Sequence, residues 1–90
     1  MDDKRLSGYP DGGVVIAESA RKHGVSDEDM VHAARHAIAE VGQGDRVLLI
    51  GAGLDGSLLE VVVLDPDTDP VIIHAMALRP KFYAYLPWGR

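Results

Sequence analysis

Residues 46–76, RVLLIGAGLDGSLLEVVVLDPDTDPVIIHAM, decide the fold because they hold three apolar runs separated by turn sequences. The runs are residues 46–51, 57–64 and 71–76. Each run has the length and the content of Val, Leu and Ile that are typical of a strand. Asp55-Gly56 favours a type I′ hairpin turn, and residues 65–70 (DPDTDP) contain prolines that cannot continue a strand. These short connections predict a three-stranded antiparallel meander.

Two helices are predicted before the strands. The longer one covers residues 26–41, where Ser26 supplies a capping hydroxyl and the acids at 27–29 suit the positive end of the helix dipole. Its apolar stripe consists of Met30, Ala34, Ala37, Ile38 and Val41. The shorter helix covers residues 14–23 and ends before Gly24, with an edge strand over its first residues as the alternative.

A short third helix is predicted near the end of the chain. Pro80 fits the first turn of a helix, where its missing N–H costs nothing, and Pro87 ends the segment. The element order α-α-β-β-β-α defines an α+β fold with the helices on one face of the sheet. We expect residues 14–90 to form this single domain and residues 1–13, rich in glycine, to be a flexible tail.

Composition and charge exclude several classes of protein. The chain has 90 residues, no cysteine and a formal net charge of −5. Disulfide scaffolds and thiolate metal sites need residues that this chain lacks. No apolar run approaches the ~20 residues of a membrane helix and the N-terminus does not resemble a signal peptide, so we expect a cytoplasmic protein outside the membrane. Residues 71–90 contain Arg79, Lys81 and Arg90 and no acid, which predicts an anion-binding region there.

Several stretches of the chain resemble the BrnT-type toxins of bacterial toxin–antitoxin pairs. They are residues 21–26 (RKHGVS), 45–51 (DRVLLIG) with 56–62 (GSLLEVV), and 71–75 (VIIHA) with Arg79, Lys81 and Tyr83. A basic helix end leads into an acidic helix start, a pair of strands follows, and a hydrophobic strand leads into the last helix. Met76 stands where the family has an arginine.

The resemblance implies a RelE-like fold and metal-independent endoribonuclease activity, with RNA as substrate and no cofactor or metal. It also implies a partner, a small antitoxin whose acidic or apolar segment covers the basic C-terminal region. Cleavage by attack of the RNA 2′-OH needs a base, an acid and cations for the charge on phosphorus. His74 is the candidate for proton transfer, because imidazole titrates near neutral pH. A structural histidine held by hydrogen bonds is the alternative.

Other residues are assigned to the same predicted site. Arg79 is expected to hold a phosphate in a bidentate manner, Lys81 to add a point charge and Arg46 to act as a weaker electrostatic helper. Tyr83 and Tyr85 are expected to stack on RNA bases.

One face of the predicted longer helix carries His32, Arg35 and His36. The two histidines have the i, i+4 spacing of a zinc-binding HExxH helix, but Ala33 stands where that motif has its glutamate. A solvated face with local ion pairs is therefore expected instead of a metal site. These three residues become helpers in RNA cleavage if the helix borders the same cleft as His74.

The end of the chain also supports a different class of function. Tyr83, Tyr85, Leu86 and Trp88 form an aromatic segment of a kind that is enriched at protein interfaces. The second hypothesis is therefore a non-catalytic interaction module that binds a small partner protein or a second copy of the chain. The acidic net charge favours this hypothesis, whereas the order of the motifs favours the ribonuclease.

Overall fold

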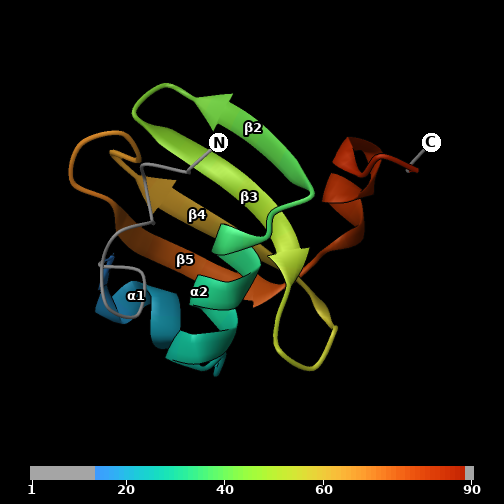
Figure 1. The fold of residues 1–90 in the computed structure, drawn as a ribbon, viewed down its shortest axis with the longest axis horizontal. Helices are drawn as coiled ribbons and strands as arrows, with labels where there is room; N and C mark the ends of the chain where they lie inside the picture. Colours follow the sequence, from blue (N-terminus) through green and yellow to red (C-terminus); the bar gives the residue numbers. More distant parts are fainter. Residues whose placement is uncertain (1–13, 89–90) are drawn as a thin grey trace.

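The computed structural model describes residues 14–88 and contains a mixed sheet with two helices against one of its faces (Figure 1). The elements are β1 (Val15–Ile16), α1 (Glu18–Arg21), α2 (Asp27–Arg35), β2 (Ala39–Gln43), β3 (Arg46–Ala52), β4 (Leu58–Leu64), β5 (Val71–Ala77) and the 3-10 helix η2 (Pro80–Tyr85). The strand order is β1-β5-β4-β3-β2. The predicted tail, residues 1–13, lies outside the described residues.

The predicted fold is wrong in the size and type of its sheet. The structure has a five-stranded mixed sheet with few helical residues, not a three-stranded antiparallel meander behind two N-terminal helices as in a RelE-like fold. Strands β3, β4 and β5 do pair antiparallel, but β2 extends the sheet on one side and β1 on the other. The β1–β5 pair is parallel, with Val15 opposite Val71.

The additional strand β2 comes from residues that the sequence assigns to the end of the longer helix. Helix α2 ends at Arg35, and Ala39–Gln43 pair with β3 instead of continuing the helix. The backbone N–H of Ile38 already donates to the carbonyl of Ile50 at 2.7 Å. The apolar residues in this region fit both the 3.6-residue period of a helix and the two-residue period of a strand. Pairing with the open edge of β3 supplies backbone hydrogen bonds that a frayed helix end lacks.

At the N-terminal end of the described chain, the edge strand given as the alternative is the structure observed. Val15 and Ile16 extend β5, and the backbone N–H of Ala17 donates to the carbonyl of Ile72 at 2.9 Å. Helix α1 is left with a single turn, in which Ala20 is buried. A helix this short has little stability of its own, so its place depends on packing against β5.

The β3–β4 connection is wider than the predicted type I′ turn. Gly56 has a positive φ of 88°, but Asp55 does not, and a type I′ turn needs positive φ at both central residues. The N–H of Gly53 donates to the carbonyl of Ser57 at 2.9 Å, and the Asp55 carboxylate accepts from the Ser57 N–H at the same distance. The hydrogen bond from the Ser57 N–H to the Asp55 side chain stabilises this connection in place of a backbone hydrogen bond of a tight turn.

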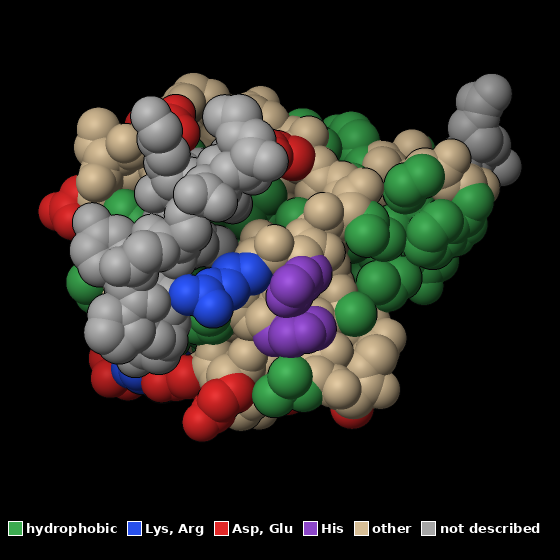
Figure 2. Space-filling model, in the orientation of Figure 1, with side chains coloured by type: hydrophobic (Ala, Val, Ile, Leu, Met, Phe, Trp, Pro, Cys, Tyr) green, Lys and Arg blue, Asp and Glu red, His purple; other side chains and the backbone are tan. Residues whose placement is uncertain are grey.

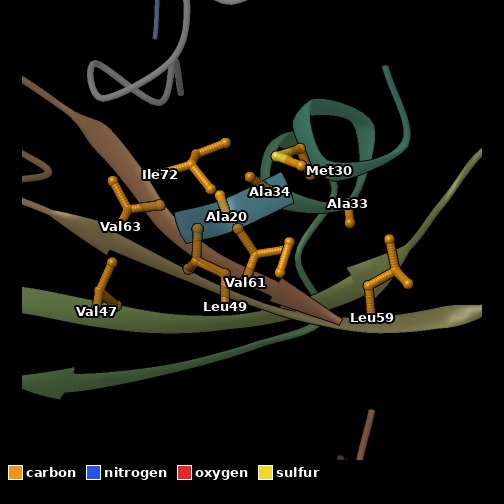
Figure 3. Packing of buried hydrophobic residues seen from close by; sticks show 11 residues of the cluster. Ala20, Met30, Ala33, Ala34, Val47, Leu49, Leu59, Val61, Val63 and Ile72 are labelled. Atoms are coloured by element: carbon orange, nitrogen blue, oxygen red, sulfur yellow. The ribbon is translucent and has the colours of Figure 1, made fainter. Parts of the chain in front are cut away.

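The hydrophobic core lies between the helices and one face of the sheet. Met30, Ala33 and Ala34 of α2 face the strands, and alternate residues of β3 and β4, including Leu49 and Val61, meet them (Figure 3). The helix is in close contact with β3 at Gly51, where a Cβ atom would lie 2.1 Å from the Ala33 carbonyl oxygen. Only glycine permits this approach.

The opposite face of the sheet is formed by the other alternate residues of the strands. Leu48 and Ile50 of β3 are buried there, and so is Glu60 of β4. After β5 ends at Ala77, the chain forms η2, which contacts β2 and lies apart from α1 and α2 (Figure 1). Within residues 14–88, no helix is long and apolar enough to span a membrane.

Candidate functional site

Glu60 is the centre of the candidate site. It lies in the middle of β4, between Ile50 of β3 and Met76 of β5, and it is the one charged side chain among the described residues that is buried, with 0% exposure. Strand alternation directs Leu59 and Val61 into the core and therefore turns Glu60 to the face without α2. A buried carboxylate needs partners to offset its lost hydration.

His74 and Arg79 supply those partners. Nε2 of His74 lies 2.9 Å from Oε2 of Glu60. The backbone N–H of Arg79 donates to Oε1 at 3.0 Å, and its guanidinium donates through Nε at 3.1 Å and through Nη2 at 2.6 Å. Both carboxylate oxygens are thus occupied by short charge-assisted hydrogen bonds. We call Glu60, His74 and Arg79 the Glu60 cluster.

The charges of the cluster follow from these bonds. Burial raises the pKa of the Glu60 carboxyl, but the hydrogen bonds from Arg79 and His74 outweigh burial, and the pKa lies below its usual value. The hydrogen bond with Glu60 raises the pKa of Arg79. An ionised carboxylate only accepts hydrogen bonds, so the His74 proton in this contact belongs to Nε2. Nδ1 is then the nitrogen that accepts a proton.

A second histidine lies beside the cluster. The His23 ring centroid is 5.7 Å from that of His74, and the rings are nearly perpendicular at 75°. His23 follows α1, which is attached to β5 by a 2.7 Å hydrogen bond from Ser19 Oγ to the Ile73 carbonyl. His23 is exposed, and the His74 side chain is 25% exposed, so both rings are accessible to a ligand.

Sequence reasoning missed His23 and Glu60 as site residues. The HGVS stretch that contains His23 supports only the family resemblance. Glu60 carried a usable signal, because it is the single charged residue in the apolar run SLLEVVVL. A carboxylate in a buried strand needs a cationic or hydrogen-bonding partner, and His74 and Arg79 follow in the next strand and loop.

The cationic side of the site continues into η2. The guanidinium of Arg79 lies 5.5 Å from the Phe82 ring centroid and Nζ of Lys81 lies 5.0 Å from it. The Phe82 ring is stacked with that of Tyr85 at 6.2 Å and 29°. Phe82 therefore brings Lys81 and Arg79 to one ring, which places two predicted phosphate ligands and one predicted stacking residue together.

Of the two other predicted residues, Arg46 is separated from the cluster and Tyr83 lies in a neighbouring groove. Arg46 stands at the start of β3, where its Nε donates to Asp45 Oδ1 at 3.0 Å; the register places it two strands from His74. Tyr83 lines a mainly apolar groove of about 660 Å³ near the end of β5. The residues lining this groove are Ser57, Leu58, Ala77, Leu78, Tyr83, Leu86 and Trp88. In Figure 2, hydrophobic side chains gather at this end of the molecule.

The predicted helpers lie across the sheet from Glu60: His32 and Arg35 belong to α2, and His36 is its C-cap residue. They line a pocket of about 390 Å³ together with Leu54 and residues of β1 and α2. Figure 2 shows histidine side chains next to a basic group on this face. The structure therefore brings these helpers together with one another but not with His74. No group of three or more His, Asp or Glu side chains within residues 14–88 converges as a metal site.

Comparison with protein-family models, with curated proteins and with solved structures finds no match to this chain. The resemblance to BrnT-type toxins therefore stays a prediction from the quoted stretches of sequence. The function has to be argued from the Glu60 cluster, from His23 beside it and from the cations of η2.

Proposed function

We propose that the chain is a metal-independent endoribonuclease in which His23 and His74 move the protons. The observation that carries the proposal is the pair of accessible histidine rings 5.7 Å apart, one of them held by the buried Glu60 that also binds Arg79. RNA cleavage by its own 2′-OH needs one group that takes a proton and one that gives a proton, and two imidazoles supply both near neutral pH.

In the proposed reaction, His74 is the base. Its Nε2 proton is held by Glu60, so Nδ1 takes the proton from the 2′-OH. The 2′-oxygen forms a bond to phosphorus while the bond from phosphorus to the 5′-oxygen breaks, and protonated His23 gives its proton to that leaving oxygen. The products are a 2′,3′-cyclic phosphate and a free 5′-hydroxyl. Glu60 is a positioning residue, since it orients His74 and stabilises the imidazolium that forms.

The cations have a separate role in the proposal. Arg79 is held by Glu60 but its side chain is 41% exposed, and Lys81 is exposed on the neighbouring helix η2. Both attract the phosphodiester and offset the charge that develops on its oxygens. The net acidic chain repels RNA elsewhere, so these cations favour docking at this end of the sheet. With RNA as substrate, we place the activity in the cytoplasm.

The test uses tag-free protein and a single-stranded RNA in buffer with EDTA. Wild type is expected to release fragments that end in 2′,3′-cyclic phosphate, and His74→Ala and His23→Ala to lose about 10²-fold or more of the rate. Lys22→Ala is the matched control, because it removes a cation one residue from His23 and should keep most of the rate. The absence of cleavage by folded wild type, or equal cleavage by His74→Ala, would overturn the proposal.

A second candidate function is binding of a partner protein at the groove of Tyr83, Leu86 and Trp88. Trp88 is 66% exposed and Tyr83 48%, and both line the same mainly apolar groove, which favours an interface there. Arg79, which is paired with Glu60, and Lys81 stand in the chain between the groove residues Leu78 and Tyr83. Residues 71–88 contain no acid, so a segment with apolar anchors and an acidic group is the complementary occupant. An antitoxin that covers the nuclease site fits this description.

Trp88 reports on this second function because it is the only tryptophan in the chain. Titration with the product of an adjacent small open reading frame should shift its fluorescence to shorter wavelength, and Leu86→Ala should weaken the binding. If Leu86→Ala leaves the binding unchanged, the groove is not the binding surface. RNA cleavage and partner binding are read separately, so one function can fail without the other.

A further inference from the structure

His32 of α2 and His36, the residue that caps the C-terminal end of α2, bring their rings side by side. The residues are one helical turn apart, their ring centroids are 4.5 Å apart, and the ring planes are inclined by 43°. Both side chains line the pocket on the helix face of the sheet. Histidines at i and i+4 of a helix are a recurring arrangement in zinc proteins.

The ring of His32 is already oriented by the sheet. Its Nδ1 lies 2.8 Å from the carbonyl oxygen of Ala52, the last residue of β3. A carbonyl oxygen only accepts, so Nδ1 carries the proton and Nε2 is left with its lone pair. Histidines that bind metals characteristically donate their other ring nitrogen to a carbonyl or a carboxylate in this way.

The distance between the rings also fits a shared ion. With metal–nitrogen bonds of ~2.0 Å, two imidazoles bound to one ion at angles of roughly 90–109° have ring centroids about 4.5–5.2 Å apart. The observed 4.5 Å lies at the short end of this range. Little rearrangement is needed, because His36 is exposed and free to adjust about its own side-chain torsions.

The charges around the pair set the kind of ion and the strength of binding. Asp27, Glu28 and Arg35 line the same pocket. The charge of Asp27 is offset by Arg21, whose Nη2 lies 2.9 Å from its carboxylate. Glu28 is exposed one turn before His32, and its negative charge opposes the positive charge of Arg35 in this pocket. Two nitrogen ligands without converging carboxylates favour a borderline-soft ion over Mg²⁺ or Ca²⁺.

We propose that His32 and His36 bind a divalent first-row transition ion, such as Zn²⁺, through Nε2 of His32 and one ring nitrogen of His36. Water completes the coordination, because no third ligating side chain converges here within residues 14–88. The site lies at the C-terminal end of α2, across the sheet from the Glu60 cluster, and it is independent of the proposed RNA cleavage, which uses no metal.

The test is a Zn²⁺ titration of tag-free protein, followed by the histidine ring ¹⁵N signals and by calorimetry. The His32 and His36 signals are expected to move together at one Zn²⁺ per chain, while Mg²⁺ moves neither. His36→Ala should weaken Zn²⁺ about tenfold or more, because a chelate becomes a single contact. His23→Ala serves as the histidine control and should leave Zn²⁺ affinity within about twofold of wild type.

Each other result overturns the inference. Movement of the His23 and His74 signals instead would assign Zn²⁺ to the wrong pair. Affinity of His36→Ala equal to that of wild type would mean that the two α2 rings do not share an ion, and an absence of any shift up to millimolar Zn²⁺ would mean that no site exists. His36 is exposed, so its removal does not disturb the core, and circular dichroism of each variant verifies the fold.

Discussion

The two faces of the sheet are stabilised by different means. On the helix face, small and apolar side chains pack closely, with Ala33 of α2 against Gly51 of β3. On the other face, the buried Glu60 is held by hydrogen bonds to His74 and Arg79. The packing on the helix face depends on side-chain volume, whereas the contacts on the other face depend on the charges of the groups and the directions of their hydrogen bonds. The Glu60 cluster therefore lies on the face where a buried carboxylate needs directed polar partners.

The helix face should be the more sensitive to added volume, and Gly51→Ala is the largest effect expected. The new Cβ would lie 2.1 Å from the Ala33 carbonyl oxygen, which belongs to backbone and cannot rotate away. We expect a loss of more than about 4 kcal/mol in the free energy of unfolding, or no folded protein. Urea unfolding followed by circular dichroism measures it.

Gly42→Ala is the control for that substitution. Gly42 also lies in a strand, β2, but a Cβ atom there would meet nothing within 4 Å and φ is not positive. The free energy of unfolding of Gly42→Ala should stay within about 0.5 kcal/mol of that of wild type. Equal losses for the two variants would mean that glycine flexibility, not the contact with α2, decides both.

The second prediction compares two arginines of almost equal exposure. Arg79 is 41% exposed and faces Glu60, which is 0% exposed, whereas Arg46 is 42% exposed and faces Asp45, which is 61% exposed. Arg79→Ala leaves a buried carboxylate short of its main partner and should cost about 2–3 kcal/mol, reduced from a fully buried pair because water reaches the gap.

Arg46→Ala should cost less than about 1 kcal/mol, since exposed ion pairs contribute little. Thermal unfolding of the two variants under the same buffer conditions measures the contrast. Similar costs for both would show that burial of the carboxylate does not control the strength of the pair. High salt should weaken the Arg46 pair more than the Arg79 pair, which provides a second readout of the same comparison.

The same contrast shows how far the sequence could predict this molecule. The strands β3, β4 and β5 and the cap at Ser26 followed from local pattern, because apolar runs, Asp-Gly and a capping hydroxyl act over short distances. The residues after Arg35 and before Glu18 could not be assigned locally. Their pattern fits helix and strand alike, and pairing with β3 or β5, which is a tertiary contact, decided the outcome.

The candidate site was predictable only in part, for a related reason. His74 and Arg79 were chosen for their chemistry, and the structure joins them through Glu60. Neither the burial of Glu60 nor the approach of His23 to His74 follows from spacing, because His23 and His74 are brought together by the packing of α1 against β5. The charge of Arg46 does not fix its place in the sheet, and the strand register puts it at the start of β3, two strands from His74.

The third prediction concerns pH and the polar face. The pKa of Glu60 is lowered in the folded chain, so its ionisation stabilises the fold fully above the unfolded value of ~4.3, and this contribution is lost as the pH falls through the lower folded pKa. Unfolding free energies of wild type and Glu60→Gln should therefore differ most near neutral pH and converge in acid.

The lowered pKa values of Asp27 and Asp55 affect both proteins alike and cancel. A constant difference across pH 3–7 would mean that Glu60 contributes by packing and not by charge.

Apart from the control substitutions, the smallest effect is expected at the helix cap. Ser26 Oγ accepts a hydrogen bond from the backbone N–H of Asp29 at 3.1 Å, and three acids occupy the first turn of α2. Ser26→Ala should cost about 1 kcal/mol, or roughly 4–8 °C in Tm for a domain of this size, and Ser26→Asn should restore most of it because asparagine caps equally well. The cost stays small because Ala33, a turn further along, fixes the helix against Gly51 whether or not the first turn frays. A loss above about 3 kcal/mol would show that the first turn and the contact at Gly51 unfold together, so that the helix face would depend on directed hydrogen bonds as much as the face of Glu60 does.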